Sequence, residues 1–364
     1  MIPFSGSYLA NDVEFLLKPL KIEPITDLEK KERLIQSGQK HYSEMIGVEQ
    51  QPDETYMRLF YQSIEDNLAR MSGDLYWVCR KIRQLRRTDK LTIVSLARAG
   101  TPIGVGMKRL LEQEFHTPTT HYSVSIIRDR GIDQQALKYI TSLHEPETIV
   151  VVDGWTGKGA IATEFEACMR NLTCPKLQRI PKELHVLCDL GGVSSNCGST
   201  EDYLIPSAIL NATISGLVSR TILNEMIGPD DFHGCVYYAD LEPRDLSKWF
   251  VEALMKSVTE QLPSLRLQAE PICDLRLARS RMHDWLQALV EEFSIKNLNL
   301  IKPGVCEATR ALLRRSANRL LVRDPADINT VHLVHLAEKN NVAVETREQM
   351  PFMATVLIRS FAHG

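Results

Sequence analysis

From Lys90 onward the chain alternates short β-rich runs with segments of helical length, and no other feature of the sequence constrains its fold as strongly. The runs LTIVSLA, THYSVSIIRD, ETIVVVDGW and ELHVLCDL predict strands, and the stretches PIGVGMKRLLEQEF, DQQALKYITSL and KGAIATEFEACMRNL predict helices. Strands connected by helices of this length form a parallel sheet that is covered on both faces. We therefore predict an α/β domain over residues 90–270, with ligands bound at the carboxyl ends of its strands.

Two further parts flank this domain. Hydrophobic spacing in residues 1–89 predicts a helical N-terminal extension packed on the main domain, with helices at 13–20, 27–37 and 54–87. Proline and mixed charge in residues 261–280, followed by a predicted helix at 282–293, indicate a boundary between residues 265 and 295. Residues 295–364 again alternate strands and helices, which predicts a small C-terminal α/β domain.

The net charge of −3 conceals an asymmetry, because residues 296–364 carry ten basic and six acidic side chains. Within this segment Lys302, Arg310, Arg314, Arg315 and Arg319 gather around one predicted helix and its entry loop. A basic face of this kind contacts RNA phosphates, although many basic helices are simply solvated. The C-terminal domain is therefore the part of the chain that is suited to a polyanion.

Cysteine usage and hydropathy point to a cytoplasmic protein. The eight cysteines occur singly, with no CxxC pair, which favours reduced thiols over disulfides or a zinc site. The sequence has no apolar run of roughly 20 residues and no N-terminal basic segment followed by an apolar one, so we expect no membrane partner. His332 and His335 form an HxxH pair, but we predict no metal held by the protein itself.

The segment TIVVVDGWTGKGAI, residues 148–161, carries the main candidate site. A buried strand ends here in Asp153 and leads through a glycine-rich turn, which contains Thr156 and Lys158, into a helix. Such a turn presents backbone N–H groups and a helix N-terminus to a phosphate, and the lysine adds positive charge. The segment matches neither GxxxxGK[ST] nor GxGxxG. The alternative is an ordinary tight turn in which Asp153 has only a capping role.

A second loop of small residues follows an earlier predicted strand. Ala97, Arg98, Ala99, Gly100 and Thr101 lead from that strand into a helix. Two loops of this kind on one sheet predict a ligand with two phosphate groups. The alternative for Arg98 is a solvent-facing side chain without a task.

A pair of arginines lies between the two loops in the sequence. Arg128 and Arg130 belong to an RDRG turn that follows the predicted strand at residues 122–127. They either close over a diphosphate or belong to a solvated turn.

These features resemble the type I phosphoribosyltransferases over residues 90–190. That family follows a hydrophobic strand with an acidic pair and a Thr/Gly-rich loop. Asp153 matches the first acid, whereas Gly154 stands in place of the second. The loop itself is matched by Trp155, Thr156, Gly157, Lys158 and Gly159.

The resemblance implies a reaction and a set of roles. Asp153 would hold the ribose hydroxyls of phosphoribosyl diphosphate (PRPP), and residues 156–159 would bind the 5-phosphate. The loop that begins at Arg98, with Arg128 and Arg130, would hold the diphosphate, and Mg²⁺ would bind through the diphosphate oxygens. The phosphoribosyl group would be transferred to or from a nitrogenous base, mainly through positioning and electrostatics.

Over nearly its full length the chain is identified as similar to a bacterial family found with tellurite-resistance and stress genes, whose members are also called StiP and labelled cysteine proteases. That resemblance implies a phosphoribosyltransferase-like domain followed by a Pelota-like (L7Ae-like) domain, which would bind RNA through Lys302, Arg310, Arg314 and Arg315. It also implies a stress-linked nucleotide pathway. The motifs that carry it are FSGSY (4–8), HYSEMI (41–46), DGWTGKG (153–159), EDYLIPS (201–207), SGLVSRT (215–221), IKPG (301–304) and EATR (307–310).

Two other functions remain open from the sequence. The first is a noncatalytic module that senses a nucleotide and binds RNA. The second is a cysteine hydrolase, which needs a thiol near an imidazole and an orienting amide or carboxylate. Its candidates are Cys188 and Cys197 with His121, His185 or His233. Neither cysteine opens a clear helix that would lower its pKa.

The polar segment 198–220 is the candidate for the base pocket, with a buried helix of satisfied polar groups as the alternative. The expected partners are PRPP or a nucleotide-like small molecule, RNA at the C-terminal domain, and a second copy of the chain in a homodimer.

Overall fold

The computed structural model describes residues 2–49 and 51–360. Its centre is a seven-stranded sheet with the order β1-β4-β3-β6-β7-β8, in which these neighbours run parallel, while β5 pairs antiparallel with β4. The predicted parallel sheet is therefore confirmed. Its strands are β1 (Glu14–Phe15), β3 (Leu91–Ala97), β4 (Thr119–Ile127), β5 (Gly131–Ile132), β6 (Ile149–Thr156), β7 (Leu184–Asp189) and β8 (Asn196–Ser199).

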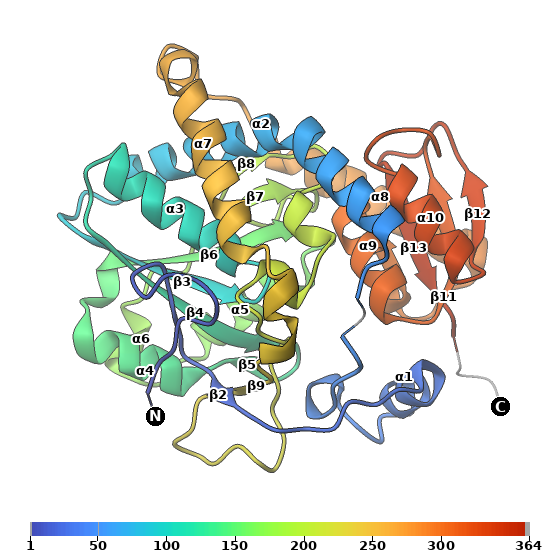
Figure 1. Ribbon diagram of the computed structural model, residues 1–364, viewed down its shortest axis with the longest axis horizontal. Coiled ribbons are helices and arrows are strands. Elements are labelled where there is room, and N and C mark those ends of the chain that lie inside the picture. Colours follow the sequence, from blue (N-terminus) through green and yellow to red (C-terminus); the bar gives the residue numbers. More distant parts are fainter. Residues whose placement is uncertain (1, 50, 361–364) are drawn as a thin grey trace.

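Helices cover both faces of this sheet, as Figure 1 shows. On one face α2 (Glu54–Leu85), α3 (Thr101–Gln113) and α7 (Ser247–Leu265) pack against one another and against the strands. On the other face lie α4 (Gln134–Leu143), α5 (Ala160–Arg170) and α6 (Pro175–Gln178). Both faces of β6 are buried along most of its length because its sequence is a continuous apolar run, which is typical of a central parallel strand.

The N-terminal segment departs from the prediction at residues 13–20, where no helix forms. Instead β1 joins the main sheet beside β4, and β2 (Lys18–Pro19) pairs with β9 (Gly234–Cys235). Phe15 and Leu16 are both fully buried, in the apolar layers on opposite faces of the sheet. Only an extended chain points successive side chains to opposite sides, and Pro19 disfavours a helix as well.

The other predicted N-terminal helices are confirmed as α1 (Leu28–Gln36) and α2. Asp27 caps the first and Asp53 caps the second. Figure 1 shows α1 below the C-terminal domain, away from β2. The short 3-10 helix η1 (Tyr42–Glu44) follows α1 in the chain. This segment therefore reaches across the molecule to the carboxyl edge of the main sheet.

Irregular chain connects β8 to α7. The buried helix considered for residues 198–220 is absent, although Ile205, Leu210 and Val218 are almost fully buried. Pro206 and Gly216, which has φ +80°, interrupt regular structure here. Besides η1, the short 3-10 helices in the described part of the chain are η2 (Pro146–Thr148), η3 (Pro206–Ala208), η4 (Ala212–Ile214), η5 (Ala239–Arg244) and η6 (Leu298–Leu300).

The C-terminal part is a small α/β unit with the strand order β10-β13-β11-β12, in which β13 runs antiparallel to both neighbours and β12 parallel to β11. Its strands are β10 (Ile301–Pro303), β11 (Ala317–Val322), β12 (Ala343–Thr346) and β13 (Ala354–Ile358), and its helices are α8 (Leu275–Phe293), α9 (Val305–Arg314) and α10 (Val331–Lys339). None of the described helices combines the length and the apolar character that a membrane span needs.

One carboxylate of the main domain holds the start of α9. Asp202 accepts hydrogen bonds from the N–H groups of Val305 and Met353, each at 2.8 Å. Helix α9 has no capping side chain of its own, so Asp202 takes that place. Tyr203 and Cys306 continue the contact in one buried apolar cluster. The C-terminal domain therefore packs closely against the carboxyl edge of the main sheet.

Candidate functional site

The loops that follow β3, β4, β6 and β7 meet at one edge, because these strands are parallel neighbours. Helix α9 of the C-terminal domain lies against this edge. A side chain at Gly157 would come within 2.6 Å of Oε1 of Glu307 on that helix. The candidate site therefore has one wall from each domain.

The glycine-rich turn after β6 is shorter than the sequence indicated. The strand itself continues to Thr156, so the turn is confined to residues 157–159. Gly159 adopts φ +89°, the left-handed region that favours glycine, and begins α5. The Thr156 hydroxyl donates to Asp189 at the end of β7, so it is already engaged.

Lys158 joins this turn to the C-terminal domain. Its ammonium donates to the carbonyl oxygens of Leu298 and, at 2.7 Å, of Ile301. Burial, followed by the neighbouring charge of Lys302, lowers the pKa of Lys158 to about 7. Lys158 therefore holds the two domains together in this structure, whereas the sequence assigned it to a phosphate.

Asp153 is buried at the carboxyl end of the sheet. Its Oδ1 accepts the N–H of Gly154 at 2.8 Å, and burial raises its pKa to about 6 despite the nearby Arg310. A Cβ atom on Gly154 would lie 3.2 Å from the carbonyl oxygen of Ala99. The position of the missing second acid is thus a close approach of two loops, which explains why glycine stands there.

Arg98 is buried, with 6% of its surface exposed, and the solvent-facing alternative is wrong. Its Nη1 donates to the carbonyl oxygen of Val218 at 2.9 Å, and its guanidinium pairs with Glu49, with Nη1 at 3.4 Å from Oε1. Thr101, at the other end of this loop, bonds the buried Ser123 hydroxyl at 2.7 Å. Arg98 is therefore held at the carboxyl edge of the sheet, between Glu49 and the chain at Val218.

The arginines of the RDRG turn separate in the structure. Nη1 of Arg128 donates to Oδ1 of Asn299 at 2.6 Å, which places it beside the C-terminal domain. Nη2 of Arg130 lies 3.0 Å from Glu44 in an exposed ion pair. Arg128 thus borders the site, whereas Arg130 agrees with the alternative of a solvated turn.

Lys302, Arg310, Arg314 and Arg315 point inward, which differs from the expectation of a free RNA face. Arg319 instead pairs with Glu345 at the partly exposed edge of the small sheet. The Arg310 guanidinium lies 4.5 Å from the ring centroid of Trp155 on β6. Arg314 donates to Asn211, and Nε of Arg315 donates to Glu32 at 2.7 Å. Lys302 is enclosed as well, and burial lowers its pKa. Sequence cannot show which side of a basic helix meets another domain.

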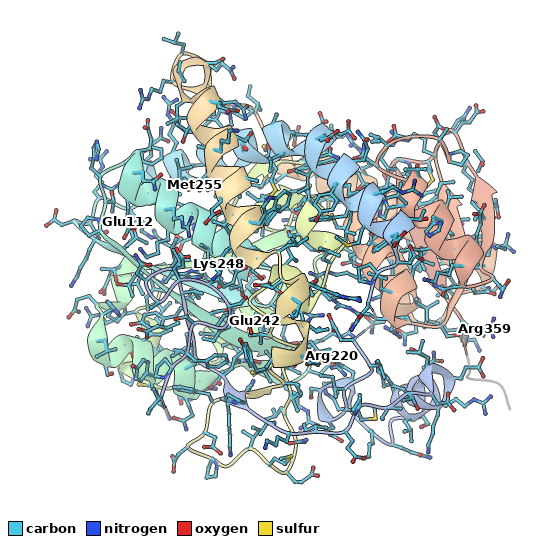
Figure 2. The ribbon with its side chains drawn as sticks, in the orientation of Figure 1. Glu112, Arg220, Glu242, Lys248, Met255 and Arg359 are labelled. Carbon is cyan, nitrogen blue, oxygen red and sulfur yellow. The ribbon has the colours of Figure 1, made fainter. Side chains whose placement is uncertain are left out.

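These side chains gather into a cation cluster at the centre of the molecule. Figure 2 shows Arg220 there, between the main domain, the segment with α1 and the C-terminal domain. Burial and the neighbouring Arg98 lower the pKa of Arg310 to about 10 and hold that of Arg314 well below its usual value. The cation cluster comprises Lys31, Arg98, Arg220, Arg310, Arg314 and Arg315.

Few carboxylates offset these charges. Glu49 pairs with Arg98, and Glu32 pairs with Arg315. Among the residues that the structure describes, buried guanidinium nitrogens of this cluster have no hydrogen-bond partner. They are Nε of Arg98, Nη1 of Arg220 and Nε of Arg310. Unpaired buried donors are costly, and so are like charges in an apolar environment. An anion with several oxygen atoms would relieve both costs.

The candidate cysteines and histidines have separate hydrogen-bond partners. Cys188 donates to the carbonyl oxygen of Glu201 at 3.0 Å, and burial raises its pKa well above the usual value. His185 bonds Asn196, and His121 bonds Ser95. Over residues 2–49 and 51–360, no thiol shares a hydrogen bond with an imidazole. In this part of the chain the candidate thiols and imidazoles are therefore not joined by a hydrogen bond.

The two HxxH histidines contact other side chains. Nε2 of His332 contacts the buried Thr309 hydroxyl at 2.7 Å, and His335 faces Asp53. In the part of the chain that the structure describes, no group of three or more His, Cys, Asp or Glu side chains is placed to hold a metal ion.

Sequence reasoning missed three polar groups of the site. Asp189, which engages Thr156, lies at the end of a predicted strand, so its position gave a usable signal. Lys31 and Glu49 come from the N-terminal segment, far from the glycine-rich loop in sequence. No local pattern marked them, because tertiary contacts alone bring them to the cluster.

The fold and this site together define an α/β protein with a parallel sheet, a small C-terminal α/β domain and a buried cation cluster between them. Residues 6–255 match the family model described as "Tellurite-like stress resistance cysteine protease StiP", and residues 280–360 match the "PELOTA RNA binding domain". The chain is 37% identical over 379 residues to the cysteine protease StiP of Acinetobacter baylyi (strain ATCC 33305 / BD413 / ADP1), covering 99% of this chain and 96% of that protein. The chain belongs to the StiP family.

Two solved structures also match in part. The hypoxanthine phosphoribosyltransferase of Trypanosoma cruzi has a TM-score of 0.27 and 12% identity, over 37% of this chain and 77% of that one. An asparagine mutant of such an enzyme, studied for its invariant aspartic acid, has a TM-score of 0.24 and 9% identity, over 40% of this chain and 75% of that one.

Proposed function

We propose that the chain binds PRPP or a ribose 5-phosphate nucleotide at the carboxyl edge of the main sheet and transfers the phosphoribosyl group to or from a nitrogenous base. The observation that carries this proposal is the cation cluster beside Asp153 and the glycine-rich turn. Its buried, unpaired guanidinium nitrogens match the many acceptor oxygens of a diphosphate. A phosphorylated ligand would supply the negative charge that Glu32 and Glu49 provide in part.

The site residues have distinct roles in this proposal. Asp153 accepts hydrogen bonds from the ribose hydroxyls, the backbone N–H groups of residues 157–159 bind the 5-phosphate, and Arg98, Arg310 and Arg314 hold the diphosphate. The C1–O bond to diphosphate breaks and its electron pair leaves with the diphosphate. The base nitrogen supplies the pair for the new C1–N bond and loses its proton to an oxygen of the departing diphosphate. The ionised Asp153 stabilises positive charge that develops on the ribose.

Magnesium would be carried by the ligand in this scheme, through the diphosphate oxygens. The surrounding donors fit this arrangement, because they are guanidinium groups that bind phosphate oxygens and not a set of carboxylates. The ion would neutralise charge on the departing diphosphate.

The test is calorimetric titration of PRPP with Mg²⁺ into the full-length protein and into Arg98→Gln. We expect micromolar binding that weakens at least tenfold in the variant, since a charge-assisted contact to phosphate is lost. Arg170→Gln removes an exposed arginine that pairs with Glu166 and should bind as the parent does. A folded parent that does not bind PRPP overturns the proposal, and the proteolytic activity named for the Acinetobacter relative then becomes the one to assay.

RNA binding is a second function, favoured by the match of residues 280–360 to the Pelota domain model. Because the cluster faces inward, the contacts would come from cations on the open surface of this domain. Arg276 and Arg281 on α8 are exposed and have the required charge.

A further inference from the structure

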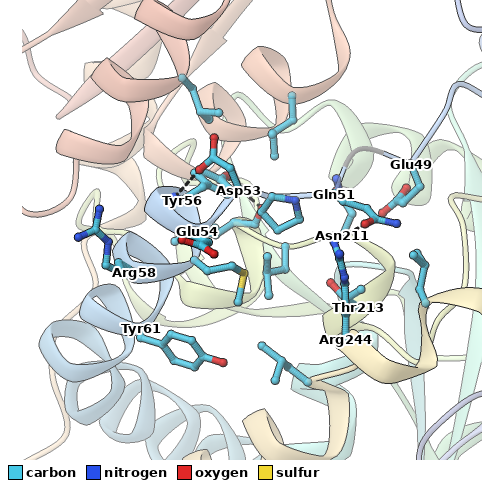
Figure 3. Close-up of a pocket in the computed structure, with 18 of the residues that line it drawn as sticks. Glu49, Gln51, Asp53, Glu54, Tyr56, Arg58, Tyr61, Asn211, Thr213 and Arg244 are labelled. Atoms are coloured by element: carbon cyan, nitrogen blue, oxygen red, sulfur yellow. Dashed lines mark hydrogen bonds between the residues drawn. The ribbon is translucent and has the colours of Figure 1, made fainter.

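A large pocket adjoins the cation cluster and has no role so far. Its volume is about 740 Å³, within the range of small-molecule sites. Three parts of the chain line it: the start of α2, the segment around η4 and η5, and the surface of α9 and α10. Figure 3 shows Glu49, Asn211, Thr213 and Arg244 along one side and Tyr61 and Arg58 of α2 on the other.

The pocket and the cluster share a wall. Glu49 lines the pocket and pairs with Arg98, and its Oε1 also accepts the N–H of Ala212 at 2.7 Å. Asn211 lines the pocket as well and accepts a hydrogen bond from Arg314. A base that takes the place of a diphosphate held by these arginines would therefore lie next to the pocket, because both groups are bonded to C1 of the ribose.

The residues that line the pocket indicate which chemical group it would hold. Met57, Ile209 and Leu246 form apolar surface, and the Tyr61 ring, 41% exposed, offers a face for stacking. At the end next to the cluster, the Glu49 carboxylate accepts hydrogen bonds, and the amide of Asn211 and the hydroxyl of Thr213 both donate and accept. A flat ring that carries amino groups and ring nitrogens satisfies all of these groups.

We propose that this pocket holds the base of the phosphoribosyl ligand, and that the base is an amino-substituted nitrogen heterocycle. The inference rests on the proposed function, because the ribose must bind beside Asp153 with its 5-phosphate at residues 157–159. It adds that the base site is built partly by the C-terminal domain, through Leu313 and Leu336. Glu49 accepts from Arg98 at both carboxylate oxygens and from the N–H of Ala212 at Oε1, and an amino group of the base would be a further donor to this carboxylate.

The test compares ribose 5-phosphate with AMP, CMP and UMP by calorimetry, in the full-length protein and in Thr213→Trp, which fills the pocket. AMP and CMP should bind at least tenfold more tightly than ribose 5-phosphate, and that gain should vanish in Thr213→Trp while ribose 5-phosphate binding stays the same. Gln287→Trp adds the same ring on the exposed surface of α8 and should keep the gain. Tyr61→Ala, which removes the stacking face, should lose most of it even if Thr213→Trp fails to fold.

The outcomes separate this inference from the proposed function. If ribose 5-phosphate binds but the nucleotides bind no more tightly, or if the gain survives in both pocket variants, the base pocket is overturned and the phosphate site stands. If UMP binds as tightly as CMP, the preference for an amino group is overturned. If neither ribose 5-phosphate nor PRPP binds, the proposed function fails together with the pocket.

Discussion

At the scale of residues, the site keeps ionisable groups in states that cost folding free energy. Asp153 is buried with its pKa raised to about 6, and Lys158 with its pKa lowered to about 7. Each shift opposes the charged form, so each charge is maintained against the local environment. Groups held in this way are typical of functional sites and are seldom explained by stability alone.

We predict that Asp153→Asn stabilises the protein near pH 7.5. The pKa of Asp153 in the folded protein lies above its value in the unfolded chain, so ionisation of this carboxyl destabilises the fold. The destabilisation is complete above pH 6, decreases as the pH falls from 6 to 4, and is absent at lower pH. The gain should reach up to roughly 3 kcal/mol at pH 7.5 and disappear near pH 4, as measured by urea unfolding. Asn keeps the oxygen that accepts the Gly154 N–H, and the exposed Asp230→Asn serves as the control. An effect that does not change with pH would contradict the assignment.

At the scale of elements, close packing of α3 on the sheet positions the arginine loop that precedes it. Two glycines of this helix face different neighbours. A Cβ on Gly104 would lie 2.7 Å from Cε1 of the buried His121 ring, whereas one on Gly106 would lie 3.1 Å from a flexible methyl of Leu254. The first neighbour is fixed by its hydrogen bonds to Ser95 and to the carbonyl oxygen of Asp12, and the second can move.

Gly104→Ala should therefore destabilise the protein by about 1–3 kcal/mol through overpacking. Gly106→Ala should change stability little, since a gain of about 1 kcal/mol in helix propensity offsets the small rearrangement of Leu254. Chemical denaturation of both variants checks the pair. Equal losses would show that the two faces of α3 are packed alike.

At the scale of the whole molecule, the C-terminal domain closes the site and supplies part of it. Lys158 and Asp202 of the main domain bind backbone groups of the C-terminal domain, while Arg310 and Arg314 project back into the cluster. The cations that the sequence assigned to RNA are thereby enclosed between the domains. RNA and a phosphorylated ribose would then use separate sets of positive charges.

We predict that Arg310→Ala combined with Arg314→Ala leaves the affinity of the full-length protein for structured RNA unchanged within about twofold. The same variant should lose PRPP binding. Arg276→Ala with Arg281→Ala should do the reverse, weakening RNA binding and reducing its salt dependence, since exposed arginines release counterions from RNA. Filter binding at two salt concentrations measures this. A tenfold loss of RNA affinity in the first variant would show that the domains open to expose the cluster.

The sequence by itself determined the parallel sheet, the helices that cover it and the second α/β unit, because alternating apolar periodicity is a local property of the chain. It also located Asp153 and Arg98, since side chains that follow parallel strands must meet at one edge. The helix that it predicted at residues 13–20 is wrong, because apolar side chains there pack on both faces of the sheet from an added strand.

The tertiary structure alone decided what surrounds the site. Lys31 and Glu49 arrive from the N-terminal segment, and Arg310 and Arg314 from α9, across separations that no local pattern records. The sequence pattern of a charged helix is the same whether its charges face water or another domain. The direction of its charges depends on which apolar surfaces are buried together, and that balance involves the whole chain.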